Sequence, residues 1–348
     1  MFDLIIRNGI VVDGTGADRR VADVAVKDGR VAKVAPAIAG NATREVDATG
    51  LIVAPGWVDI HTHYDGQVTW DDELGPSAWH GVTTLVMGNC GVGFAPVRPD
   101  RHAWLIALME GVEDIPGSAL AEGIKWSWET FPEYLDALEK MPRSLDVAAQ
   151  IPHGAVRAYV MGERANDRLA TADDIDAMAK IVEEGMRAGA LGFSTSRSLN
   201  HRASDGTVTP SYAAASDELA GIARGAGALG AGVLQLISDF DDVDAEFAIV
   251  RRMLEVSGRP LSVSILQMPH APGRWAEILD RVEAAAAAGL PIRGQVCGRP
   301  IGVILGLETS VNPFSACTGF AEVAHLPLAE RLAALRAPER RARILAEF

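Results

Sequence analysis

From Leu51 onward, short apolar segments alternate with amphipathic ones, and this rhythm constrains the fold more than any other feature. We predict strands at 57–63, 84–90, 146–151, 190–196, 232–238, 260–266 and 291–297. Repeated strand–helix units build parallel sheets with right-handed crossovers. The predicted fold class is therefore α/β, a TIM-like (β/α) barrel that lacks a recognisable eighth strand.

The segments between the predicted strands carry helix signals. The clearest begins at Thr171, which Asp174 follows three residues later as in a capping box, and runs to about Arg187. Further helices are predicted at about 101–112, 216–229, 244–256 and 275–288, with a helical tail at 328–348.

The first 50 residues follow a different pattern. Short runs at 4–7, 10–12, 21–26 and 31–34 are typical of strands. Asn8-Gly9, Asp13-Gly14 and Asp28-Gly29 lie between them as turn signals, and the last is typical of a hairpin. We expect two domains: an N-terminal β unit at 1–54 and the incomplete barrel at 55–348.

Composition excludes several classes of function. A net charge of −14 argues against a nucleic-acid surface, which needs clustered Lys and Arg. No apolar run reaches the roughly 18 residues of a membrane span, and no secretory signal is visible at the start. The 3 cysteines are too few and too scattered for a disulfide framework, so we expect a cytoplasmic protein.

The strongest chemical signal is His61-Thr62-His63 at the end of the first predicted barrel strand. Residues two apart in a strand point to one face, so both imidazoles should face the carboxyl end of the barrel. Two neighbouring imidazoles are good ligands for zinc and similar ions. Two surface histidines would give the same pattern, but the apolar strand and the preceding Pro55-Gly56 favour the metal interpretation.

Cys90 ends the second predicted barrel strand, within the glycine-rich segment 88–93. Its thiolate is expected beside the histidine pair, where the glycines allow the backbone to approach closely. A buried structural cysteine is an equally good interpretation of the spacing.

These motifs carry a family resemblance. The run 47–65 resembles the first barrel strand of the amidohydrolase superfamily, and the β unit before it resembles half of that superfamily's small sandwich domain. Segment 88–91, with Ala95-Pro96 soon after, is similar to the motif of N-acyl-D-amino-acid deacylases, where a cysteine replaces a carboxylated lysine. Segment 190–196 contains no lysine, which argues against the hydantoinase and dihydroorotase branch.

The resemblance implies an enzyme that hydrolyses non-peptide C–N bonds in small N-acyl amino acids or related amides. It implies Zn or another divalent metal, as one or two ions, with His61, His63 and Cys90 as ligands. Neither nucleic acid nor a membrane is expected as a partner.

The sequence departs from the family where further ligands are expected. Gln235 and Gln267 stand where the family has histidines at the fifth and sixth strands. Asp239 and His270 fall a few residues later: Asp239 is our candidate catalytic base and His270 a possible alternative ligand. The strand that carries the family's aspartate is not found before Phe348, so we expect a C-terminally truncated chain.

Three further residues are candidate substrate contacts. His201 and Arg202 lie in a polar loop after the fourth strand, and the Arg202 guanidinium suits a substrate carboxylate. A solvated loop without a substrate role is an equal alternative. His153 ends the third strand, with a structural histidine as an equal alternative. The missing ligands also leave two other hypotheses open: a catalytically degenerate ligand-binding protein, or an inactive fragment.

Overall fold

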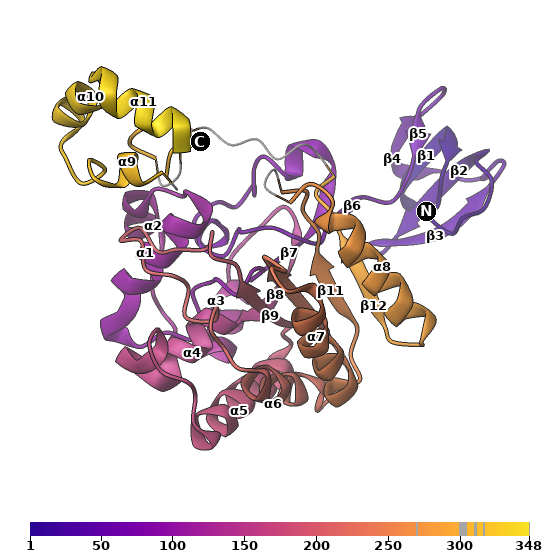
Figure 1. Cartoon of the computed structure of the whole chain (residues 1–348). Helices are drawn as coiled ribbons and strands as arrows, with labels where there is room; N and C mark the ends of the chain where they lie inside the picture. The colour runs from indigo at the N-terminus through magenta and orange to yellow at the C-terminus, as the bar shows by residue number, and fades with distance from the viewer. Residues whose placement is uncertain (269–270, 299–304, 310–311, 316, 348) are drawn as a thin grey trace. The chain divides into compact units, whose positions relative to one another are not determined.

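The computed structural model describes residues 1–268, 271–298, 305–309, 312–315 and 317–347 (Figure 1). The chain divides into two compact units, Met1–Asp59 with Gly75–Leu85 and Ile60–Leu74 with Val86–Phe348. The expected domain boundary between residues 54 and 55 stays a prediction. Among the described helices, none combines the length and apolar character needed to cross a membrane.

The first unit contains a small mixed sheet. Its strands are β1 (Phe2–Val11), β2 (Arg20–Lys27), β3 (Arg30–Ala35), β4 (Ala42–Asp47) and β5 (Ile52–Val53). They follow the order β3-β2-β1-β4, and β5 also pairs with β1. The antiparallel β2–β3 pair turns at Asp28-Gly29, which confirms the predicted hairpin.

One predicted turn in this sheet is wrong. Asn8-Gly9 does not separate two strands, because β1 continues through it. Asn8 adopts a left-handed φ of 57°, and the register with β2 shifts between Ile6 and Gly9. The Asn-Gly pair therefore makes a bulge, which uses the same backbone conformation as a tight turn.

The parallel sheet has seven strands in the part of the chain that is described. They are β6 (Trp57–Asp59), β7 (Val82–Met87), β8 (Asp146–Pro152), β9 (Gly192–Arg197), β10 (Val233–Ser238), β11 (Leu261–Ser264) and β12 (Ile292–Gln295). Their order, β12-β11-β10-β9-β8-β7-β6, follows the sequence as in a curled half-barrel. All seven predicted strands are present, and they confirm the fold class.

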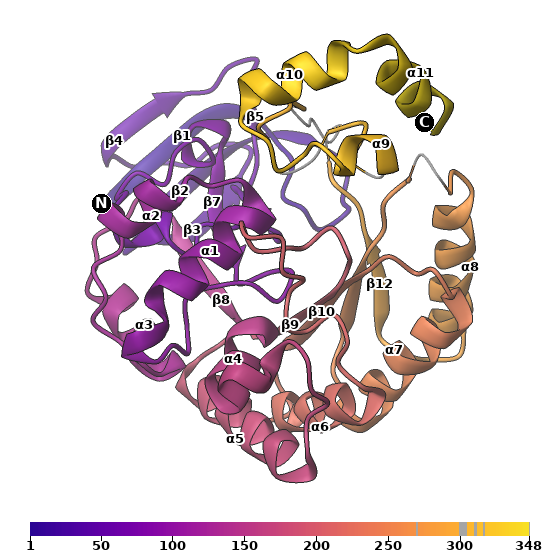
Figure 2. The ribbon, with the colours of Figure 1, turned by 60° about the vertical axis from the view of Figure 1, so that its left-hand side comes forward.

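Helices separate the parallel strands. They are α1 (His102–Glu113), α2 (Gly117–Gly123), α3 (Phe131–Glu139), α4 (His153–Met161), α5 (Ala172–Ala188), α6 (Ser216–Gly227), α7 (Val243–Ser257) and α8 (Arg274–Ala287). Figure 2 shows α4 to α8 along the outer side of β8 to β12. Thr171 and Asp174 form the predicted capping box at the start of α5. The helical tail is also confirmed, as α10 (Leu328–Arg336) and α11 (Pro338–Glu347), with α9 (Thr318–Ala321) before them.

Alternation along the strands separates the core from the site. In β10, Leu234 and Leu236 are fully buried apolar residues, while Gln235 between them is a buried amide. Successive residues of a strand face opposite sides, so Gln235 lies on the other side of the sheet from the two leucines. Ser194 and Ser196 of β9 are likewise fully buried.

Candidate metal centre

His61, His63 and Cys90 come together in the structure, and we call them the His–Cys trio. One ligand atom from each lies within 4.8 Å of the others. Nε2 of His61 is 3.1 Å from Sγ of Cys90, and the two imidazole rings are 5.4 Å apart between centroids. Ligand atoms at these separations can contact a single ion, because metal–ligand bonds of zinc sites measure about 2.0–2.3 Å.

The backbone that carries the trio differs from the prediction. β6 ends at Asp59 and β7 ends at Met87, so all three side chains lie in irregular segments just beyond the strands. Thr62 explains how the two histidines still align. Its backbone N–H and its hydroxyl both donate to the carbonyl of Val86, at 3.0 and 2.7 Å, which fixes the segment between them.

The Cys90 turn is held by side chains from distant strands. Cys90 has a left-handed φ of 55°, and its N–H donates to Oε1 of Gln235 at 2.9 Å. The next N–H, that of Gly91, donates to Oγ of Ser194 at 2.9 Å. Gly88 is required at the start of the turn, since a Cβ there would come within 2.0 Å of the Gln150 carbonyl.

Two residues that the sequence did not point to also contact the trio. Oε1 of Glu113, the last residue of α1, is 3.2 Å from Nε2 of His63. Oε1 of Gln295, at the end of β12, is 3.4 Å from Nδ1 of His61. No spacing pattern links either residue to the histidines, so no signal in the sequence marks them.

The electrostatics of the site favour a cation. Burial raises the pKa of Asp65 to about 7. Burial, with Asp65 and Asp114 nearby, raises the pKa of Glu113 to about 8. Burial also raises the pKa of the Cys90 thiol, and Glu113 and Asp65 raise it further. In the described residues, neither Asp65 nor Glu113 forms an ion pair with a lysine or arginine.

The imidazole of His63 is held neutral. Burial lowers the pKa of His63 well below its usual value, and His61 and His201 lower it further. Nδ1 of His63 and Oδ2 of Asp65 are buried without a hydrogen-bond partner. Buried polar atoms are normally satisfied. Neutral imidazole, a thiol and uncompensated carboxyl groups together fit a divalent ion such as zinc.

His201 lies near the trio, but Asp239 and Arg202 are engaged elsewhere. Nδ1 of His201 is 2.7 Å from Oγ of Ser196, and burial lowers the His201 pKa to about 4, with opposing influences from Asp239 and His61. Arg202 is exposed and donates to the Gly206 carbonyl.

Asp239 does not join the trio as the sequence suggested. Its Oδ1 accepts from the Ser198 hydroxyl at 2.6 Å and its Oδ2 from the Leu199 N–H at 2.7 Å. Both carboxylate oxygens therefore fasten the loop after β9. Glu113 is the carboxylate that contacts a trio histidine.

His153 belongs to the core. It begins α4 and is completely buried, with Nδ1 2.8 Å from Oγ1 of Thr195 and Nε2 3.0 Å from Oε1 of Glu218. Arg157 donates to the same Glu218 oxygen at 2.7 Å. We call these four residues the His153 network. Because both ring nitrogens are bonded inside the fold, the structural alternative replaces the predicted substrate contact.

Gln267 and His270 are the remaining positions where the sequence suggested a metal ligand. Gln267 is exposed and donates to the Pro272 carbonyl at 3.4 Å, so it does not occupy a ligand position. His270 lies outside the described residues.

A cavity of about 230 Å³ opens at the ends of β9, β10 and β11. Its lining includes Ser198, Asn200, Asp239, Ser264, Leu266 and Arg274. Oγ of Ser264 accepts from Nε2 of Gln235 at 3.2 Å, and Gln235 in turn accepts from Cys90. Two hydrogen bonds therefore connect this cavity to the trio.

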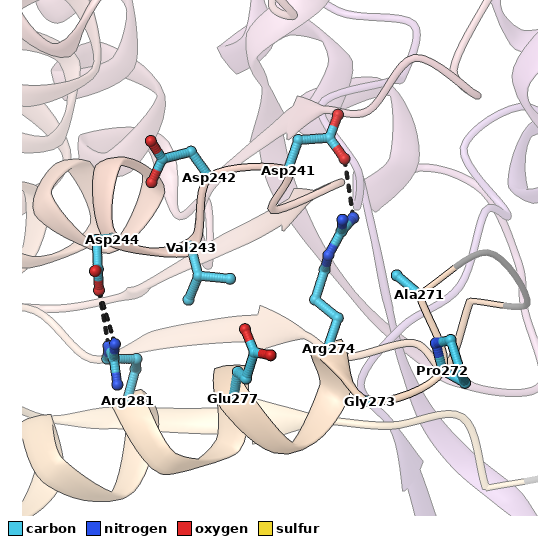
Figure 3. A pocket seen from close by; sticks show the side chains of 10 residues that line it. All are labelled: Asp241, Asp242, Val243, Asp244, Ala271, Pro272, Gly273, Arg274, Glu277 and Arg281. Atoms are coloured by element: carbon cyan, nitrogen blue, oxygen red, sulfur yellow. Dashed lines mark hydrogen bonds and ion pairs between the residues drawn. The ribbon is translucent and has the colours of Figure 1, made fainter.

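A second depression, of about 520 Å³, lies between the starts of α7 and α8 (Figure 3). Two of its acidic side chains face arginines: Arg274 pairs with Asp241 and Arg281 with Asp244, both at 2.9 Å. Its described lining contains neither histidine nor cysteine. We interpret it as an ion-paired surface groove.

The curled parallel sheet and the trio beyond its first strands define an α/β-barrel protein with a metal-type site. The model of the Amidohydrolase family matches residues 44–347. The chain therefore belongs to the amidohydrolase family, which confirms the resemblance inferred from its sequence.

D-aminoacylases are among the proteins to which the chain is similar. D-aminoacylase from Alcaligenes xylosoxydans xylosoxydans is 37% identical over 194 residues, which are 56% of this chain and 37% of that protein. A crystal structure of D-aminoacylase has a TM-score of 0.73 at 28% identity, covering 100% of this chain and 70% of that one. The chain spans less than two thirds of the length of the curated relatives that it matches.

A further crystal structure is that of N-acyl-D-glutamate deacylase from Bordetella bronchiseptica. It contains zinc and a phosphonate inhibitor that mimics the tetrahedral intermediate of the reaction. Its TM-score is 0.67 at 28% identity, with 86% of this chain and 59% of that one covered.

Proposed function

We propose that this protein hydrolyses the amide bond of N-acyl amino acids, with a divalent ion held by His61, His63 and Cys90. The observation that carries the proposal is the convergence of these three ligand atoms within 4.8 Å. Membership of the amidohydrolase family supports the reaction class.

The residues around the site set its charge and hold the candidate ligands in place. A divalent ion bound there would act as a Lewis acid that polarises the amide carbonyl and lowers the pKa of water. Cys90, as a thiolate, would contribute one negative charge to such an ion, and neutral imidazoles would contribute none. Gln235 fixes the Cys90 backbone and Gln295 contacts His61, which limits the motion of the ligands.

The substrate class rests on the relatives and on the cavity beside the trio. D-aminoacylase and N-acyl-D-glutamate deacylase are similar to this chain, so N-acyl-D-amino acids are the first substrates to test. In the cavity of about 230 Å³, Leu266 offers an apolar surface that suits the side chain of an amino acid. The Arg274 guanidinium in its lining is already paired with Asp241.

Metal content and hydrolysis, measured on the same purified protein, test the proposal. We expect bound zinc and faster hydrolysis of N-acetyl-D-amino acids than of their L enantiomers. A His61→Ala, His63→Ala double variant should lose both properties. His80→Ala is the matched control, because His80 is an exposed histidine outside the trio. Metal-free protein that binds these compounds without cleaving them would contradict the proposed hydrolase and indicate a binding protein.

A further inference from the structure

Asn89 is a polar residue of the glycine-rich turn, next to the trio in the sequence but not part of it. It directly precedes Cys90, and it is completely buried. Its Nδ2 donates to the backbone carbonyls of Thr62 and Val86, at 3.2 and 3.0 Å. Buried polar side chains are normally hydrogen-bonded. Asn89 is therefore distinguished by the identity of its partners and not by its burial.

These partners belong to the backbone that carries the histidines. The Thr62 carbonyl is part of the peptide bond to His63, so the Asn89 carboxamide contacts the chain between the two imidazoles. The Val86 carbonyl in β7 also accepts from the N–H and the hydroxyl of Thr62. One side chain thus connects the segment that carries both histidines with the turn that carries the thiol.

The orientation of the Asn89 carboxamide follows from its surroundings. Nδ2 lies beside two carbonyl oxygens, which can only accept, so the NH2 end of the amide must face them. Oδ1 accepts from Nε2 of Gln150 in β8, at 2.7 Å. The amide oxygen of Gln150 is itself buried without a hydrogen-bond partner, which is unfavourable. The fold therefore completes the bonds of Asn89 while it leaves its neighbour unsatisfied.

We propose that Asn89 is a positioning residue of the metal centre: its carboxamide fixes the separation between the Cys90 thiol and the two histidines. This inference rests on the proposed function, since it assumes that the trio binds a divalent ion. Cys90 has a left-handed φ of 55°, which is strained for a residue with a Cβ. Such a conformation persists only where the surroundings hold it. Asn89 ties the turn to the histidine segment, and Gln235 holds the Cys90 N–H from β10.

Zinc affinity, measured by competition with a chromophoric chelator, tests this role. Asn89→Ala removes both donated bonds and should bind zinc at least about 10-fold more weakly, as is usual when a group that supports metal ligands is lost. Thr195→Val is the matched control, because it removes another fully buried hydrogen bond, that to His153, outside the trio. The zinc affinity of this control should equal that of the wild type.

A second variant separates zinc affinity from stability. Gln150→Leu removes the donor to Asn89 together with the unsatisfied oxygen, at nearly constant side-chain size. We expect it to lose zinc affinity, though less than Asn89→Ala, without a matching fall in the thermal stability of the metal-free protein. If Asn89→Ala does not fold, Gln150→Leu still tests the inference.

Cobalt absorption distinguishes a positioning role from a general structural role. A thiolate bound to cobalt absorbs in the near ultraviolet, and this band should be weaker per bound ion in Asn89→Ala and Gln150→Leu, because the thiol is no longer held beside the histidines. Thr195→Val should keep the full band. Wild-type zinc affinity or an unchanged band in both variants, or equal losses in the control, would overturn the inference. Wild-type protein that binds neither zinc nor cobalt would overturn the proposed function, and this inference with it.

Discussion

The chain contains two histidine clusters that differ in how their polar atoms are hydrogen-bonded. In the His153 network, both ring nitrogens are bonded, and the Glu218 carboxylate is matched by the Arg157 guanidinium. In the His–Cys trio, Nδ1 of His63 has no hydrogen-bond partner, and the nearby carboxyl groups of Glu113 and Asp65 have neither a lysine nor an arginine paired with them among the described residues.

The difference shows that burial alone does not distinguish a functional histidine. His153 is completely buried, and its surroundings complete every interaction it can make. The trio is partly buried and incomplete, and what it lacks is positive charge. Polar groups that are satisfied within the fold hold it together, whereas groups that remain unsatisfied indicate a ligand.

The largest expected effect comes from the trio. The His61→Ala, His63→Ala double variant should lose bound metal and reduce hydrolysis to background, because several kcal/mol of transition-state stabilisation depend on the ion. Its free energy of unfolding without metal should stay near that of the metal-free wild type. Zinc analysis, enzyme assays and urea unfolding check this. Strong destabilisation of the metal-free variant would assign the trio a structural role like that of His153.

The second effect concerns the His153 network, where we expect a change in stability and not in metal binding. Glu218→Ala leaves Arg157 buried without its partner and should cost about 3–5 kcal/mol of stability. Chemical unfolding measures the loss. The control is Glu183→Ala, which breaks an exposed pair with Arg187 and should change stability by less than about 0.5 kcal/mol. Equal results for the two variants would contradict the distinction between the clusters.

A third, smaller effect is expected where the sheet supports the trio. Gln235→Leu removes the acceptor of the Cys90 N–H, and an unsatisfied buried donor costs about 1–3 kcal/mol. The same change should weaken zinc binding, because the turn that carries the thiol is no longer fixed. Gln267→Leu, at an exposed position, serves as control. Unchanged stability and zinc affinity in Gln235→Leu would show that Gln235 does not support the metal centre.

The smallest effect is the pH dependence of the His153 network. Burial opposes ionisation of Glu218, but the hydrogen bond and charge of His153, followed by those of Arg157, bring its pKa below the ordinary value. A pKa lowered by folding stabilises the protein above the unfolded-state value, and this stability is lost as pH falls through the folded-state value. The stability advantage of the wild type over Glu218→Gln should therefore shrink on acidification. Urea midpoints measured from pH 7 downward test this, and an advantage that grows instead would contradict it.

Local patterns predicted the elements well. The strand–helix rhythm gave all seven parallel strands, and Thr171 with Asp174 gave the start of α5. The His-x-His spacing and the glycine-rich turn identified the three residues that converge. These signals depend on neighbours in the sequence, so a single sequence contains them.

Contacts between distant residues were beyond the reach of the sequence. Gln235 and Cys90 are 145 positions apart, and only the order of the strands brings the amide to the turn. Glu113 reaches His63 from the end of a helix, where no periodicity marks it. His153 was expected at the site because it ends a strand, but the carboxylate of Glu218, 65 residues later, holds it in the core.

Cobalt titration of the purified chain tests the central claim most directly. Cobalt reports sulfur ligation through a near-ultraviolet charge-transfer band that imidazole and carboxylate ligands do not produce. We expect the band to appear with bound cobalt, to disappear in Cys90→Ser, and to persist in Cys317→Ser, whose thiol is buried away from the trio in the cluster with Phe320 and Ile344. Absence of cobalt binding, or a band that survives in Cys90→Ser, would contradict a metal centre built on His61, His63 and Cys90.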